Sequence, residues 1–66
     1  MTVHREIEKF LRATEMPPTK FGRLAVRDPR FVFDLRMGRE PGPRITARVR
    51  SFLAEQKRVR QQELGQ

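Results

Sequence analysis

The chain has 66 residues, 36% of them hydrophobic and 35% charged, so it can form one small domain but cannot bury a large core. It is strongly basic, with a formal net charge of +7 at pH 7, and it has no cysteine for a disulfide framework or a thiolate zinc site. No apolar run approaches the roughly 18 residues of a membrane span, and residues 1–20 lack the apolar stretch of a signal peptide, so we expect a cytoplasmic protein.

A first helix is predicted for residues 3–14. The apolar residues of this segment are spaced i, i+4, i+7 and i+8, as on one face of a helix, and are Val3, Ile7, Phe10 and Leu11. Thr2 is the expected N-cap, because its hydroxyl can accept a hydrogen bond from the first turn. The prolines at positions 17 and 18 end the helix, since the residue before a proline is pushed out of the α region.

A second, short helix is predicted to begin at Pro18, because a proline loses no hydrogen bond in the first turn. Its apolar stripe consists of Phe21, Leu24 and Ala25. Gly22 lies inside this helix, where glycine costs about 1 kcal/mol relative to alanine. Two explanations remain open: another helix approaches closely at Gly22, or the glycine is simply tolerated or marks a kink.

Residues 29–37 are predicted to form a third helix. Asp28 is a favourable N-cap, Pro29 is preset for the first helical position, and Gly38 is the expected C-cap glycine. The buried stripe of this helix is formed by Phe31, Val32 and Leu35. The opposite, exposed face carries four residues spaced i, i+3, i+4 and i+7, which are Arg30, Phe33, Asp34 and Met37.

A fourth helix is predicted to start near Arg44, after the loop of residues 40–43 (EPGP). Its stripe repeats the spacing of the first helix, with Ile45, Val49, Phe52 and Leu53. Past Ala54 the chain turns polar, so residues 56–66 either extend this helix or fray. We therefore expect an all-α fold, a small bundle of four helices, with residues 1–55 forming the domain.

The basic residues are concentrated in the second and later helices. Residues 1–19 carry three basic and three acidic side chains, whereas residues 20–60 carry twelve basic and four acidic ones. Twelve of the fifteen basic residues are arginine, whose planar fork suits phosphate and guanine. A polyanion is the expected partner. A solvated surface with a basic bias is the alternative, and a membrane surface is disfavoured because no long helix is apolar on one side and basic on the other.

Residues 19–39 (TKFGRLAVRDPRFVFDLRMGR) carry a pattern of apolar, small and glycine positions. The pattern comprises Phe21-Gly22, an apolar Ala25 or Val26 before the turn, Val32 and Leu35, and the closing run Leu35-Arg36-Met37-Gly38-Arg39. In these positions the chain resembles the Cro/repressor-like (lambda-repressor-like) helix-turn-helix family of phage and bacterial transcription regulators. Two positions depart from the family: Val26-Arg27 replaces the usual turn glycine, and Pro29 replaces a polar start.

The resemblance implies a sequence-specific, double-stranded DNA-binding transcription regulator whose recognition helix, residues 29–37, enters the major groove. Arg30 is then the expected bidentate guanine contact. Asp34 either accepts a hydrogen bond from a cytosine amino group or orients Arg30 across one turn, and we favour the second role. Phe33 either touches a thymine methyl group or serves as a core or dimer-contact aromatic.

Six basic residues on helix ends and loops are the expected phosphate contacts: Lys20, Arg23, Arg27, Arg36, Arg39 and Arg44. Neutralising about five to seven phosphates predicts that log K falls with log salt with a slope of roughly −4.5 to −6. Arg48 is a further candidate for a phosphate contact. Family precedent adds a homodimer on a pseudo-palindromic site, formed through the fourth helix, and a nucleoid-associated location.

Two other functions are compatible with these residues. A sequence-tolerant nucleoid or architectural protein would bind DNA by charge alone, and a protein-interaction module would dock an acidic partner through Phe33 and Met37. An enzyme is disfavoured, because His4 is the sole histidine and no nucleophile or paired carboxylate stands at a suitable spacing. We expect neither a metal site nor a cofactor, since metal-ligand clusters and phosphate-cradling glycine loops are missing.

Overall fold

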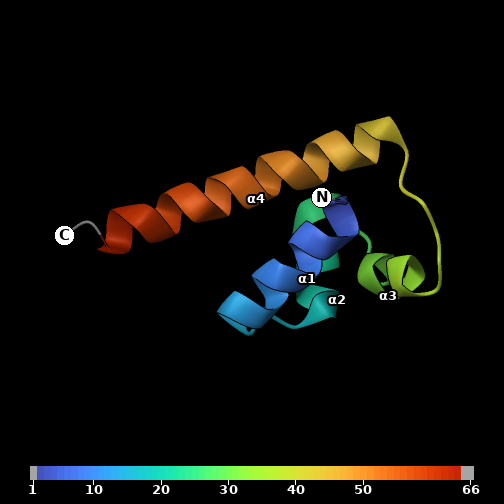
Figure 1. Ribbon diagram of the computed structural model, residues 1–66, viewed down its shortest axis with the longest axis horizontal. Helices are drawn as coiled ribbons and strands as arrows, with labels where there is room; N and C mark the ends of the chain where they lie inside the picture. The colour runs from blue at the N-terminus through green and yellow to red at the C-terminus, as the bar shows by residue number, and fades with distance from the viewer. Residues whose placement is uncertain (1, 65–66) are drawn as a thin grey trace.

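The computed structural model describes the backbone of residues 2–64 and the side chains of residues 2–59. Within that range the chain forms four helices, α1 Val3–Thr14, α2 Pro18–Val26, α3 Phe31–Arg36 and α4 Pro43–Leu64, and no strand. The predicted all-α class and helix number are confirmed. In Figure 1, α4 runs along one side of the molecule and extends beyond the group formed by the other three helices.

Helix α1 has the predicted bounds because both of its ends are set locally. The hydroxyl oxygen of Thr2 accepts a hydrogen bond from the backbone N–H of Arg5 at 3.2 Å, so Thr2 is the N-cap. The helix stops where Glu15 adopts a left-handed conformation, with φ 58°, and donates its N–H to the carbonyl of Leu11 at 2.8 Å. Val3, Ile7 and Leu11 are buried along one face.

Helix α2 begins at Pro18, as predicted, but its buried face is not the predicted stripe. The buried residues are Phe21, Gly22 and Ala25, while Leu24 is 53% exposed. In a nine-residue helix a few apolar residues do not define the centre of the buried face. Gly22 belongs to that face because the next segment of chain packs directly against it, and this places Leu24 at the outer edge.

Gly22 is required by the close approach of the turn after α2. A Cβ at this position would collide with the carbonyl oxygen of Asp28 and would lie 3.3 Å from the Cβ of Phe31. The backbone N–H of Asp28 donates to the carbonyl of Gly22 at 3.0 Å, which ties the turn to the helix. Of the two explanations for this glycine, close approach is correct, although the nearest atoms belong to the turn and not to another helix.

Helix α3 is shorter than predicted, beginning at Phe31 instead of Pro29. Asp28 is not the N-cap of this helix, contrary to the prediction: the N-cap is Arg30, which makes no side-chain capping bond. Asp28 instead accepts the N–H of Arg30 at its carboxylate (3.0 Å) and that of Phe31 at its carbonyl (3.1 Å). These bonds form a turn at residues 29 and 30, and the first α-type bond runs from the N–H of Asp34 to the carbonyl of Arg30.

The C-terminal end of α3 confirms the predicted C-cap glycine. Gly38 has φ 102° and donates its N–H to the carbonyl of Leu35 at 3.0 Å. The N–H of Arg39 reaches back to the carbonyl of Asp34, also at 3.0 Å. This pair of bonds is the Schellman arrangement, in which glycine accommodates the left-handed residue. It ends α3 one residue before the predicted Met37.

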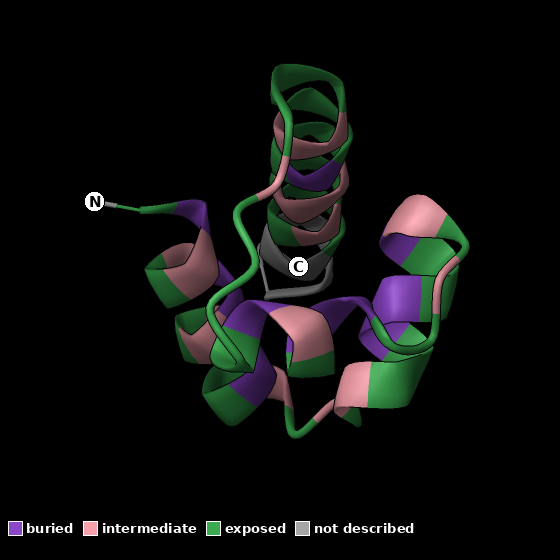
Figure 2. Cartoon of the chain, turned by 90° about the vertical axis from the view of Figure 1, so that its right-hand side faces the viewer, coloured by how far each residue is buried: buried purple, intermediate pink, exposed green. Residues whose placement is uncertain are grey.

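Helix α4 closes the core and continues past the packed part of the molecule. Val49 is buried, and Ile45, Phe52 and Leu53 pack against the core, as their spacing predicted. The rings of Phe10 in α1, Phe21 in α2 and Phe52 in α4 meet with centroids 5.3–6.3 Å apart. Figure 2 shows the buried segments where the helices face one another. The polar segment from residue 56 is helical as far as Leu64, so it extends α4.

Candidate nucleic-acid interface

The exposed face of α3 and the turn before it contains most of the residues singled out from the sequence. Arg30 is exposed in the turn, Phe33 is 42% exposed and Met37 is 87% exposed, while Asp34 is only partly exposed. The inner face is closed, because Phe31, Val32 and Leu35 are at most 4% exposed. Exposed and buried residues are therefore divided as predicted, except that Arg30 precedes the helix and Met37 follows it.

Asp34 pairs with Arg39 and not with Arg30, which corrects the favoured prediction. Its carboxylate oxygen Oδ2 lies 2.9 Å from Nη1 of Arg39. The Schellman turn brings Arg39 back over the last turn of α3, so both its backbone N–H and its guanidinium meet Asp34. Arg30 instead lies ahead of the helix with its N–H bound to Asp28, and its guanidinium has no hydrogen-bond partner among the described residues.

Arg36 is held by Glu8 of α1, so the structure does not present it as a free phosphate contact. Its Nε and Nη2 donate to the two carboxylate oxygens of Glu8 at 2.8 and 3.0 Å. The Arg36 guanidinium carbon also lies 5.7 Å from the ring centroid of Phe33, within range of a cation–π interaction. Spacing along the sequence does not reveal this pair, because its members lie on separate helices.

Glu8 has a second partner, since its Oε2 lies 2.9 Å from Nε2 of His4. The hydrogen bonds from Arg36 lower the pKa of Glu8 to about 2; burial opposes this shift, and His4 adds to it. The same hydrogen bonds raise the pKa of Arg36. His4, the sole histidine, is half-buried and contacts Glu8. Only the His4–Glu8 spacing of four residues could have pointed to this cluster.

The other predicted phosphate contacts are exposed and form no ion pair with any side chain in residues 2–59; they are Lys20, Arg23, Arg27 and Arg44. Arg27 ends α2 with φ 59°, the left-handed conformation for which a turn residue is usually glycine. Its N–H donates to the carbonyl of Arg23 at 3.1 Å. The turn therefore forms without a glycine, at the expense of a strained arginine.

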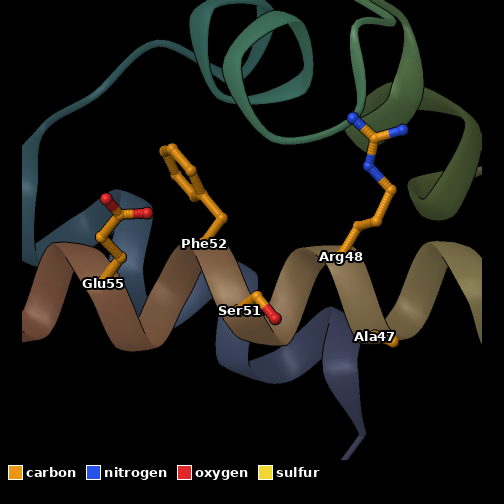
Figure 3. A pocket seen from close by; sticks show the side chains of 5 residues that line it. All are labelled: Ala47, Arg48, Ser51, Phe52 and Glu55. Atoms are coloured by element: carbon orange, nitrogen blue, oxygen red, sulfur yellow. The ribbon is translucent and has the colours of Figure 1, made fainter.

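A shallow depression of about 340 Å³ lies along α4 between Arg48 and Glu55, with Phe52 between them. In Figure 3, Arg48 and Phe52 both point from α4 toward the ribbons of the neighbouring helices, and Ala47 points away. The two charged side chains that line this depression, Arg48 and Glu55, lie at its opposite ends and do not contact each other as a pair.

In the described residues, no three His, Asp or Glu side chains gather closely enough to hold a metal ion. No helix in the same residues combines the length and apolar character needed to cross a membrane.

Comparisons with protein-family models, with curated proteins and with solved structures find no match for this chain.

Proposed function

We propose that this chain is a sequence-specific, double-stranded DNA-binding transcription regulator, in which α2, the following turn and α3 act as a helix-turn-helix. The supporting observation is the outer surface of α3 and its two ends: Phe33 on the helix, Arg30 just before it and Met37 just after it are exposed, while the opposite face of the helix is closed. The major groove is about 12 Å wide and admits one helix, so such a face can reach base edges.

Arg30 is the residue proposed to read a base, as a bidentate donor to guanine. Its guanidinium is exposed and has no partner in the described residues, so no ion pair must break before it binds. Phe33 is proposed to contact a thymine methyl group. Asp34 is proposed to act through Arg39, which it holds with a charge-assisted hydrogen bond of 2.9 Å.

The surrounding cations are proposed to supply affinity without sequence information. Lys20, Arg23 and Arg27 follow the outer side of α2 and its turn, and Arg44 lies in the first turn of α4. The absence of carboxylate partners for these four side chains within residues 2–59 leaves them available for phosphates.

The test is selection from a random duplex library with the wild type, with Arg30→Ala and with Arg12→Ala. Arg12 is an exposed arginine on α1, outside the proposed surface, and its loss changes the net charge equally. We expect an enriched motif that Arg30→Ala degrades at a guanine position and that Arg12→Ala leaves intact. Binding without an enriched motif would instead indicate a sequence-tolerant architectural protein.

A protein-interaction module is the second candidate, favoured by the exposure of two large apolar side chains, Phe33 on α3 and Met37 just after its end. A basic surface around them suits an acidic partner. This candidate would gain support if no duplex were retained in moderate salt while an acidic protein was captured and then lost with Met37→Ser.

The regulator is proposed to act as a homodimer through α4 in a cytoplasmic, nucleoid-associated location. A single such domain reads about four to six base pairs, too few for tight specificity in a genome. Sedimentation of the protein alone and on a selected duplex tests this part, and a monomer under both conditions would rule it out.

A further inference from the structure

Glu8 connects the scaffold helix α1 to the proposed recognition helix α3. Its two carboxylate oxygens accept hydrogen bonds from Nε and Nη2 of Arg36 at 2.8 and 3.0 Å. This is the bidentate geometry that makes arginine–carboxylate pairs both strong and directional. The side chain of Glu8 is 26% exposed and that of Arg36 is 43% exposed, so the pair lies at the edge of the core and remains within reach of a ligand.

Arg36 also contacts the exposed aromatic residue of α3. Its guanidinium carbon lies 5.7 Å from the ring centroid of Phe33, one helical turn earlier. The guanidinium therefore contacts both Glu8 and the Phe33 ring. A side chain held in this way cannot turn toward a phosphate without breaking two hydrogen bonds.

We propose that Glu8 is a positioning residue of the DNA-binding surface, which withholds Arg36 from the phosphates and holds its guanidinium beside Phe33. This inference rests on the proposed function. Glu8 limits the number of sequence-independent contacts, because one fewer cation meets the backbone. It also restricts the orientation of Phe33, which is proposed to reach a base. Both effects favour discrimination between sequences over general affinity.

The inference predicts how the salt dependence of DNA binding changes with substitution. Glu8→Gln releases Arg36 to bind a phosphate, so the slope of log K against log salt should become steeper by about 0.9. Between 50 and 200 mM salt this corresponds to an additional loss of affinity of roughly three- to fourfold. Arg36→Gln alone and the double variant Glu8→Gln/Arg36→Gln should both keep the wild-type slope, since neither provides an additional cation.

A matched control is available on the same helix. Glu6 pairs with Arg50 of α4 at 3.3 Å, so Glu6→Gln makes the same charge change and also releases an arginine. Arg50 faces Glu6 of α1 and is not among the proposed DNA contacts, so we expect the slope to stay at its wild-type value. A steeper slope in both glutamine variants would show a general charge effect and would overturn the inference.

Two further results would also overturn it. If Arg36→Gln makes the slope shallower by about 0.9, then Arg36 already binds a phosphate in the wild type. If Glu8→Gln is folded and its slope is unchanged, then Glu8 does not withhold Arg36. If Glu8→Gln does not fold, the slope measured for Arg36→Gln alone decides whether Arg36 binds a phosphate in the wild type.

Failure of the proposed function gives a different pattern. Wild-type protein that binds no duplex at low salt would remove both the function and the inference. If the wild type binds duplex DNA but the salt slopes of the variants differ from those predicted, only the role of Glu8 is excluded and the proposed function stands. The ion pair itself can be followed without DNA, by the carbon chemical shift of the Glu8 carboxyl group in wild type and Arg36→Gln.

Discussion

At the scale of single residues, Gly22 and Arg27 meet the backbone requirements of the connection between α2 and α3. Gly22 lacks the side-chain atom that would meet the carbonyl of Asp28, and Arg27 adopts a left-handed conformation with φ 59°. Position 22 therefore requires glycine, because a Cβ would not fit there. The left-handed backbone at position 27 would favour glycine, but the residue there is an exposed, charged arginine.

Gly22→Ala should destabilise the protein strongly. The added Cβ has to displace backbone of the turn, not a flexible side chain, so we expect a loss of at least about 2 kcal/mol in the free energy of unfolding. Gly42→Ala is the control, because nothing lies within 4 Å of its Cβ position. Urea unfolding of the two variants measures the difference. Similar midpoints for both would contradict the close approach at Gly22.

Arg27→Gly should raise the stability of the protein but lower its affinity for DNA. Glycine adopts the left-handed conformation without strain, so the free energy of unfolding should rise by about 0.5–1 kcal/mol. The same substitution at Glu15, with φ 58° at the end of α1, should stabilise similarly. DNA affinity should fall only for Arg27→Gly, which loses a proposed phosphate contact. Thermal unfolding and fluorescence anisotropy measure the two effects, and unchanged stability in both variants would exclude the strain.

At the scale of helices, α3 is too short to be stable without contacts to its neighbours. Its six residues are fewer than the about 12–15 that an isolated helix needs to persist in water. It packs chiefly on α2, and the Glu8–Arg36 pair ties it to α1. The orientation of the proposed recognition face is therefore set by tertiary contacts.

The tie between α1 and α3 should weaken in acid. The pKa of Glu8 is lowered from its usual 4.5 to about 2, so its stabilising effect is complete above about pH 4.5 and is lost as the pH falls toward 2. Arg36 and His4 are the charged or titratable groups facing it. The stability difference between wild type and Glu8→Gln, about 1 kcal/mol for a partly exposed pair, should vanish over this range. Denaturation at a series of pH values measures it, and a constant difference would contradict the pairing.

At the scale of the whole molecule, the positive charge is divided between paired and unpaired side chains. Two of the six predicted phosphate contacts are engaged by carboxylates, Arg36 by Glu8 and Arg39 by Asp34. Four of the six predicted contacts, Lys20, Arg23, Arg27 and Arg44, therefore have no carboxylate partner among residues 2–59.

This division lowers the expected salt dependence of DNA binding. Four available cations predict a slope of log K against log salt of about −3.6, shallower than the −4.5 to −6 expected from the sequence. Titrations of one selected duplex at several salt concentrations measure this slope. A value near −5.4 would mean that Arg36 and Arg39 leave their carboxylates on binding.

Local features of the sequence were sufficient to predict most of the secondary structure and the core. Thr2, the prolines after α1 and Gly38 act on the backbone within a few residues, so they set helix ends regardless of the rest of the chain. The spacing of Ile45, Val49 and Phe52 likewise identified the packed face of α4, because a helix of this length presents a full stripe. The outer face of α3 followed from the same periodicity.

Only the tertiary structure decided which side chains pair across helices. Leu24 fell outside the core because α2 is short and Gly22 receives the turn. Glu8 pairs with Arg36 because the packing of the helices brings α1 and α3 together. Asp34 pairs with Arg39 instead of Arg30 for a local reason, since the Schellman turn folds the chain back over the end of α3. Capping hydrogen bonds and hydrophobic spacing act over a few residues, so the sequence alone reveals them. The Glu8–Arg36 pair depends on how two helices pack against each other, so only the tertiary structure shows that Arg36 is engaged by a carboxylate.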